Sequence, residues 1–161
     1  MSLYNRILVP VDGDAPASHA LDHALAIARD QGARLKLITV LDKGVADYRG
    51  AEVGWLDREK WHEELRVHAS ATLESAGERV RAAAADVPVE TEVVDAPKGG
   101  VWKRILQAAE DWRADLLVVG THGRHGVDRV LLGSVSEALV RHGHLPLLVV
   151  PAHEEAQSGG S

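Results

Sequence analysis

The sequence predicts an α/β fold, with a Rossmann-like open parallel sheet of five strands and helices on both faces. Apolar runs of strand length alternate along the chain with segments in which apolar residues recur at helical spacing. The apolar residues are mostly Ala, Val and Leu, with no Phe, which suits aliphatic strands covered by Ala-rich helices. A chain of 161 residues can form one domain with a sizeable core. We therefore expect a single domain over 1–151 and a polar, disordered tail at 152–161.

The chain begins with a predicted strand, helix and strand. The apolar run at 6–11 predicts a buried first strand. Pro16 suits the first turn of the helix that follows, and Gly32 suits its end. The apolar run at 35–41 predicts the second strand.

The middle of the chain predicts a loop, a long helix and an edge strand. Residues 42–54 are polar, contain several glycines and show no period, so we expect a surface loop. From Trp61 to Val80, apolar residues return at steps of three and four, which predicts a helix over about 55–85. Residues 89–94 alternate in part and predict a third strand, at an edge of the sheet.

The last part of the chain predicts two more pairs of a helix and a strand. Helical spacing at 101–112 precedes a fourth strand at 116–119. A helix from about 134 to 141 precedes a fifth strand at 145–150. Pro146 favours an edge position for that strand, because proline cannot donate a hydrogen bond within a sheet.

The most informative segment follows the fourth strand. Gly120, Gly123, Gly133 and Ser134 form the spacing G-x2-G-x9-G-S. Glycines let a ligand approach the backbone without a Cβ in the way. The segment ends at a helix N-terminus, whose unpaired N–H groups and positive dipole end can hold an anion. Ordinary turns are the alternative, but the full spacing with its hydroxyl residue favours a bound nucleotide.

Two loops with unusual chemistry follow strand ends, at 10–14 and at 120–134. In open parallel sheets, ligands bind beyond the carboxyl ends of the strands, where the strand order reverses. If strands one and four are neighbours, both loops face the same crevice.

Composition and motifs exclude several classes of function. Without cysteine there are no disulfides, Cys-based zinc sites or thiol chemistry. The formal charge of −6 argues against a general attraction to nucleic acid. No apolar stretch has the length of a signal-peptide core or of a membrane helix, so we expect a cytoplasmic protein without membrane contact. His19 and His23 are spaced to share a metal, but no third ligand is evident, and exposed helix histidines are the better interpretation.

These motifs closely resemble the universal stress protein family over nearly all of residues 5–150. The resemblance rests on the segments 7–12, 114–124, 132–136 and 146–151. It implies the sheet order 3-2-1-4-5, which makes strands one and four neighbours. It also implies membership of the ATP-binding branch, which carries the glycine motif.

The resemblance implies specific roles at the base and ribose. Asp12 would accept hydrogen bonds from ribose hydroxyls or help to hold Mg²⁺ on the phosphates, although capping of a turn is its alternative role. The backbone of Val40 would contact adenine, while its side chain packs in the core. Gly120 would permit the close approach of the ribose.

Phosphate binding would fall to the glycine loop and the helix after it. Gly123 and Gly133 would offer N–H groups, and Ser134 and Ser136 would add hydroxyl donors. The complete predicted nucleotide-binding set is Pro10, Val11, Asp12, Val40, Gly120, Thr121, His122, Gly123, Arg124, Gly133, Ser134, Val135 and Ser136. Asp12 is also the predicted Mg²⁺ ligand.

The leading hypothesis is a stress-response or regulatory module that binds ATP, or AMP or ADP, with Mg²⁺. No poised nucleophile–base pair stands out, so whether the chain is an enzyme is left open, with at most slow ATP hydrolysis expected. A slow hydrolase of the adenine-nucleotide α-hydrolase-like group is one alternative. A partner-binding dimer module with a structural nucleotide is another.

The apolar strand at 145–150 predicts a homodimer. An exposed edge strand of this kind is a template for pairing, which proteins normally cover. The resemblance implies that two copies pair antiparallel through this strand, across a twofold axis.

Overall fold

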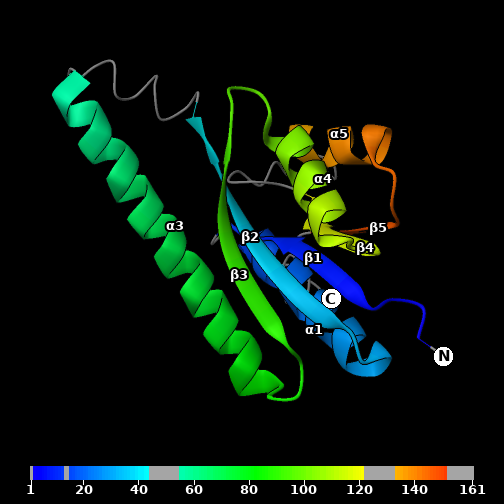
Figure 1. Ribbon diagram of the computed structural model, residues 1–161. Helices are drawn as coiled ribbons and strands as arrows, with labels where there is room; N and C mark the ends of the chain where they lie inside the picture. Colours follow the sequence, from blue (N-terminus) through cyan, green and yellow to red (C-terminus); the bar gives the residue numbers. More distant parts are fainter. Residues whose placement is uncertain (1, 13–14, 44–54, 122–132, 152–161) are drawn as a thin grey trace, which may run out of the picture.

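The computed structural model describes residues 2–12, 15–43, 55–121 and 133–151, which form a sheet with helices on both faces (Figure 1). In chain order the elements are β1 (Arg6–Pro10), α1 (Ala15–Gln31), β2 (Arg34–Asp42), α3 (Trp55–Ala83), β3 (Val89–Ala96), α4 (Val101–Trp112), β4 (Leu116–Gly120), α5 (Ser134–His142) and β5 (Leu147–Val150). The five strands are ordered β3-β2-β1-β4-β5. All neighbouring strands are parallel. The predicted α/β class and the strand order 3-2-1-4-5 are confirmed.

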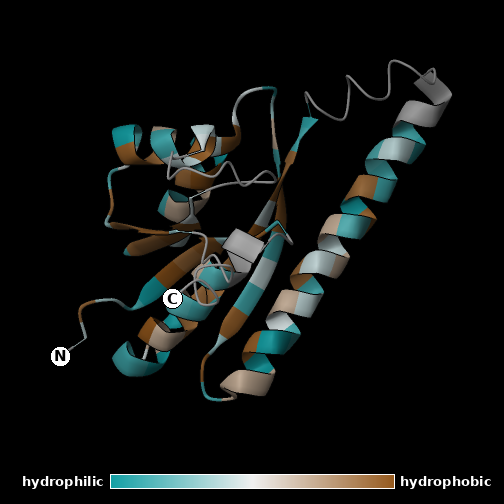
Figure 2. Cartoon of the chain, turned by 180° about the vertical axis from the view of Figure 1, so that it is seen from behind, coloured by the Kyte–Doolittle hydropathy of each residue, from teal (hydrophilic) through white to brown (hydrophobic). Residues whose placement is uncertain are grey.

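Two apolar cores lie on the two faces of the sheet. On one face, α1 and α3 cover strand residues that include Ile7, Leu35 and Val118. On the other face, α4 and α5 cover strand residues that include Leu8 and Leu117. Successive side chains of a strand point to opposite faces, so nearly continuous apolar strands are needed to supply both cores. Figure 2 shows the hydrophobic colour along the central strands and more hydrophilic colour along α3.

The element boundaries follow the predicted ones closely, with one instructive difference in β5. Gly32 ends α1 with a φ of +68°, a conformation that glycine adopts without strain. β5 begins at Leu147 rather than at the predicted position 145. Pro146 has no N–H, so only its carbonyl joins the sheet, where it accepts a 3.0 Å hydrogen bond from the Leu117 N–H.

Trp112 fixes α4 on the sheet. The Arg6 guanidinium lies over the Trp112 ring, 4.4 Å from its centroid. The Arg6 Nε donates to the Trp112 carbonyl at 2.7 Å. The indole Nε1–H donates to the Glu90 carboxylate at 2.6 Å. These contacts hold the end of α4, so its first turns lie at the carboxyl edge of the sheet.

Some predicted segments fall outside the described residues. These are the tail at 152–161 and most of the loop at 42–54, of which Asp42 is the last residue of β2. As far as the helices are described, none has the combination of length and apolarity that a membrane crossing requires.

Candidate functional site

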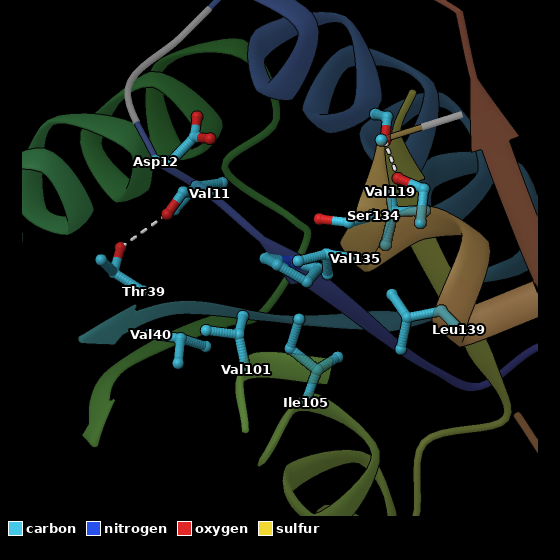
Figure 3. Close-up of a pocket in the computed structure, with 14 residues that line it drawn as sticks. Val11, Asp12, Thr39, Val40, Val101, Ile105, Val119, Ser134, Val135 and Leu139 are labelled. Atoms are coloured by element: carbon cyan, nitrogen blue, oxygen red, sulfur yellow. Dashed lines mark hydrogen bonds between the residues drawn. The ribbon is translucent and has the colours of Figure 1, made fainter. Parts of the chain in front are cut away.

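A cavity of about 310 Å³ opens at the carboxyl edge of the sheet. Its walls come from the ends of β1, β2 and β4, from the first turns of α4 and from α5 as far as Leu139 (Figure 3). The lining residues are Pro10, Val11, Asp12, Thr39, Val40, Val101, Ile105, Val119, Gly120, Gly133, Ser134, Val135, Ser136 and Leu139. The cavity lies between β1 and β4, where the strand order reverses, which is the usual ligand position in such sheets.

Most of the predicted site residues meet in this cavity. Nine of them line it: Pro10, Val11, Asp12, Val40, Gly120, Gly133, Ser134, Val135 and Ser136. Thr121 is buried just beyond β4 and is not among the lining residues. His122, Gly123 and Arg124 lie outside the described residues.

β1 and β4 separate before they reach the cavity, and Pro10 explains why. Their last paired residues are Leu8 and Leu117. In a parallel sheet the side to which the N–H and C=O groups point alternates along the strand. The Arg6 carbonyl accepts a 2.8 Å hydrogen bond from the Asp115 N–H, so Pro10 also faces β4. Pro10 has no N–H to donate, and the β1–β4 pairing ends there.

β1 and β2 remain joined for one residue longer. The Val11 N–H donates to the Ile38 carbonyl at 2.7 Å. The Val11 carbonyl accepts a 2.8 Å hydrogen bond from the hydroxyl of Thr39, which is buried. Figure 3 shows this bond at the rim of the cavity. A side-chain hydroxyl therefore satisfies the carbonyl at which β1 leaves the sheet.

The N-terminus of α5 presents unpaired backbone N–H groups to the cavity. Gly133 is the N-cap residue, with φ −62° and ψ 161°, and no side chain of the described residues caps the helix. The first hydrogen bond of the helix runs from the Glu137 N–H to the Gly133 carbonyl at 2.9 Å. The N–H groups of Ser134, Val135 and Ser136 precede it and have no backbone partner among the described residues. An anion at this end of the helix would be favoured by these N–H groups and by the dipole.

Two predicted phosphate donors are used by the protein itself. The Gly133 N–H donates to the Thr121 carbonyl at 2.6 Å, so it is not available to a phosphate as the sequence suggested. The Ser136 hydroxyl donates to the Gly120 carbonyl at 2.7 Å, and its side chain is buried. The exposed Ser134 keeps its place at the helix start.

The opposite wall of the cavity is apolar, and sequence reasoning missed most of it. Val101 and Ile105 reach the cavity from α4, and Leu139 reaches it from α5. The sequence predicted only the two helices that carry these residues, at 101–112 and at about 134–141. Helical spacing could not show that the start of α4 borders a cavity, because that depends on how far β1 and β4 separate.

Charge is sparse in the described part of the cavity. Asp12 is exposed and is the only acidic residue among the described lining residues. Within the described ranges, no three His, Asp or Glu side chains are grouped to hold a metal ion. A cation at this site would therefore be coordinated by both Asp12 and a bound anion such as phosphate.

The sequence model that describes the universal stress protein family matches residues 3–151. The chain belongs to this family. A universal stress protein of Methanocaldococcus jannaschii is 35% identical over 153 residues, which cover 92% of this chain and 83% of the relative.

Solved structures of universal stress proteins share the fold. One from Burkholderia pseudomallei has a TM-score of 0.71 at 30% identity, covering 94% of this chain and 99% of the other. A universal stress protein solved in complex with cAMP has a TM-score of 0.65 at 26% identity. That match covers 94% of this chain and 100% of the other.

Proposed function

We propose that this universal stress protein binds an adenine nucleotide, ATP with Mg²⁺, in the cavity between β1 and β4, and that it acts as a nucleotide-responsive regulatory module. One observation carries the proposal: the cavity places an apolar wall opposite a helix N-terminus whose first three N–H groups have no backbone partner in the described part of the chain (Figure 3). A nucleotide has the matching polarity, with an apolar aromatic base at one end and an anion at the other. The structure solved with cAMP shows that a family member can hold an adenine nucleotide.

The base end of the cavity suits a flat aromatic ring. Val40, Val101 and Ile105 supply aliphatic surface without a charged group. Burial of a purine face against such surface is favourable at about 25 cal/mol per Å² of apolar area. Hydrogen bonds to the ring edge would come from backbone groups, as the family resemblance implies for Val40.

The phosphate end is the first turn of α5. The N–H groups of Ser134, Val135 and Ser136 offer a set of donors in fixed positions. Gly133 carries no Cβ, so a phosphate can approach the backbone at the N-cap. Asp12 stands across the opening, where it would accept from the ribose hydroxyls or help to hold Mg²⁺.

A charge substitution at the helix start tests the site. Ser134→Glu places a carboxylate where the phosphates are proposed to bind, and we expect ATP affinity to fall at least about tenfold by like-charge repulsion. The fold should remain intact, because a carboxylate in the first turn of a helix is stabilising. Ser134→Gln is the matched control, since it has the same size without the charge. Equal calorimetric affinities for Ser134→Glu and Ser134→Gln would show that the phosphates bind elsewhere.

The geometry supports a binding module rather than a fast hydrolase. The described cavity residues include one carboxylate, that of Asp12, and three hydroxyl groups. Those of Thr39 and Ser136 donate to backbone carbonyls, and the third belongs to the exposed Ser134. Among the described lining residues, no hydroxyl is hydrogen-bonded to a side chain that could act as its base. We therefore propose that nucleotide binding itself, with at most slow hydrolysis, is the activity of the site.

A homodimer through β5 is the second part of the proposal. β5 is an edge strand. The carbonyl of Pro146, just before β5, accepts from the Leu117 N–H of β4, and the carbonyl of Val150 accepts from the N–H of Thr121, just beyond β4. By alternation, the N–H and C=O groups of Leu147 and Val149 point away from the sheet. Antiparallel pairing of two copies around Leu148 would join Leu147 of each copy to Val149 of the other. This arrangement would cover the exposed β5 edge of each copy.

A further inference from the structure

The hydroxyl of Thr39 lies at the cavity but bonds to the protein's own backbone. Its Oγ1 donates to the Val11 carbonyl at 2.8 Å, and the residue is buried at 9% exposure. Figure 3 shows the Thr39 and Val11 side of the cavity next to Val40. The hydroxyl is therefore already committed before any ligand arrives.

This bond replaces a backbone bond that a regular sheet would form. The Ile38 carbonyl accepts from the Val11 N–H, so residue 38 of β2 faces β1. The Leu35 N–H donates to the Pro88 carbonyl, so the odd-numbered residues of β2 face β3 instead. Val40 is even-numbered and faces β1. The next bond of a regular parallel ladder would run from the Val40 N–H to the Val11 carbonyl.

That ladder bond is not formed. In the described ranges the Val11 carbonyl accepts from Thr39, and the Val40 N–H has no partner on β1. Val40 lines the cavity, and by alternation along β2 its N–H and C=O both point toward the β1 side. One residue thus offers a donor and an acceptor side by side. The edge of adenine presents the complementary pair, a ring-nitrogen acceptor beside the amino-group donor.

We propose that Thr39 is a positioning residue for the nucleotide base: by satisfying the Val11 carbonyl, its hydroxyl keeps the Val40 N–H free to donate to the adenine edge. The inference rests on the proposed function of the cavity. Without the hydroxyl, a buried carbonyl would lack a donor, which is costly. The nearest backbone donor along the ladder is the Val40 N–H. If this N–H donated to the Val11 carbonyl, it could no longer donate to the ligand.

Two measurements on the nucleotide-free and nucleotide-bound protein test the role of Thr39. Thr39→Val keeps the shape and removes the donor, and Thr39→Ser keeps the donor. Thr91→Val is the matched control, because Thr91 is exposed on β3 away from the cavity. The first measurement is amide hydrogen exchange at Val40 by NMR, without ligand. The second is calorimetric affinity for ATP and for tripolyphosphate, which lacks the base.

We expect Thr39→Val to slow exchange at Val40 and to weaken ATP about tenfold, the effect of losing one hydrogen bond of the base. Tripolyphosphate affinity should not change. Thr39→Ser should restore wild-type values, and Thr91→Val should match wild type throughout. Equal losses for ATP and tripolyphosphate, or unchanged ATP affinity, would overturn the role of Thr39. If Thr39→Val does not fold, Thr39→Ala serves in the same comparison.

Failure of the proposed function would look different. Wild-type protein that binds neither ATP nor tripolyphosphate would refute the nucleotide site. The exchange rate at Val40 would then still decide whether the Thr39 hydroxyl keeps the Val40 N–H from bonding to the Val11 carbonyl. Unchanged exchange in Thr39→Val would overturn the structural step of the inference, and slowed exchange would support it.

Discussion

The Ser136 hydroxyl donates a 2.7 Å hydrogen bond to the Gly120 carbonyl, which ties the first turn of α5 to the last residue of β4. A second bond, from the Gly133 N–H to the Thr121 carbonyl at 2.6 Å, joins the same two elements through the backbone. Together these bonds fix the N-terminus of α5 relative to the sheet. The unpaired N–H groups of the helix are thereby held at the cavity before a ligand binds.

Ser136→Ala should destabilise the protein by about 1–2 kcal/mol, because the half-buried Gly120 carbonyl loses its donor. Urea denaturation of the variant and of wild type measures the difference. Ser134→Ala is the control, since Ser134 is exposed, and its effect should stay within about 0.5 kcal/mol. Equal stabilities of Ser136→Ala and wild type would mean that the bond does not hold α5.

The fold could be predicted from the sequence because each element carries its own local signal. The apolar runs, the helical spacing from Trp61 onward and the glycine at position 32 all appear in the structure as expected. The strand order could not be obtained from these local signals, because it depends on contacts between distant segments. It came from the family resemblance.

The site was predictable as a set of residues but not as a set of bonds. Glycine and hydroxyl residues at a strand end and helix start indicated where a ligand would bind. Whether a given donor is free depends on tertiary neighbours. The hydrogen bond from the Gly133 N–H to the Thr121 carbonyl therefore could not be predicted from the local sequence. The same holds for Thr39, which in the sequence is simply one residue of an apolar strand.

Removal of Mg²⁺ should weaken ATP binding. In Asp12→Asn, the difference between the ATP affinities with and without Mg²⁺ should be smaller. If Asp12 helps to hold the metal on the phosphates, loss of its charge removes a ligand of the kind that Mg²⁺ prefers. We expect ATP affinity in the presence of Mg²⁺ to fall about tenfold in Asp12→Asn, and affinity in EDTA to change little. Asp86→Asn, in the connection between α3 and β3, is the control. An equal dependence on Mg²⁺ in Asp12→Asn and wild type would place the metal ligand elsewhere.

Val149→Pro should convert the proposed dimer to a monomer. The Val149 N–H points away from β4, so proline there removes a donor of the pairing edge and no hydrogen bond within the sheet. Sedimentation at tens of micromolar measures the state of assembly. Thr91→Pro makes the equivalent change on the opposite edge of the sheet and should leave the dimer intact. A wild-type protein that sediments as a monomer would refute the dimer, and a dimeric Val149→Pro variant would refute its placement on β5.

Hydrolysis of ATP should be slow, well below the roughly 10 s⁻¹ of a typical dedicated enzyme. The physical reason is that no described residue of the cavity is arranged as a nucleophile with its base. Release of phosphate or pyrophosphate from saturating ATP measures the rate. A turnover at or above that figure, abolished by one substitution in the cavity, would reveal a catalytic group in the site.

The most direct test of the nucleotide site is an NMR titration of nucleotide-free protein with ATP and Mg²⁺. The two ends of the proposed site carry separate probes: the backbone amides of Ser134 and Val135, and the methyl groups of Val101 and Ile105. We predict that both sets of resonances shift together and saturate at the same ATP concentration, because the phosphates and the base of one molecule contact opposite walls of the cavity. If ATP leaves both sets unchanged, or shifts resonances only away from the cavity, the central claim is contradicted.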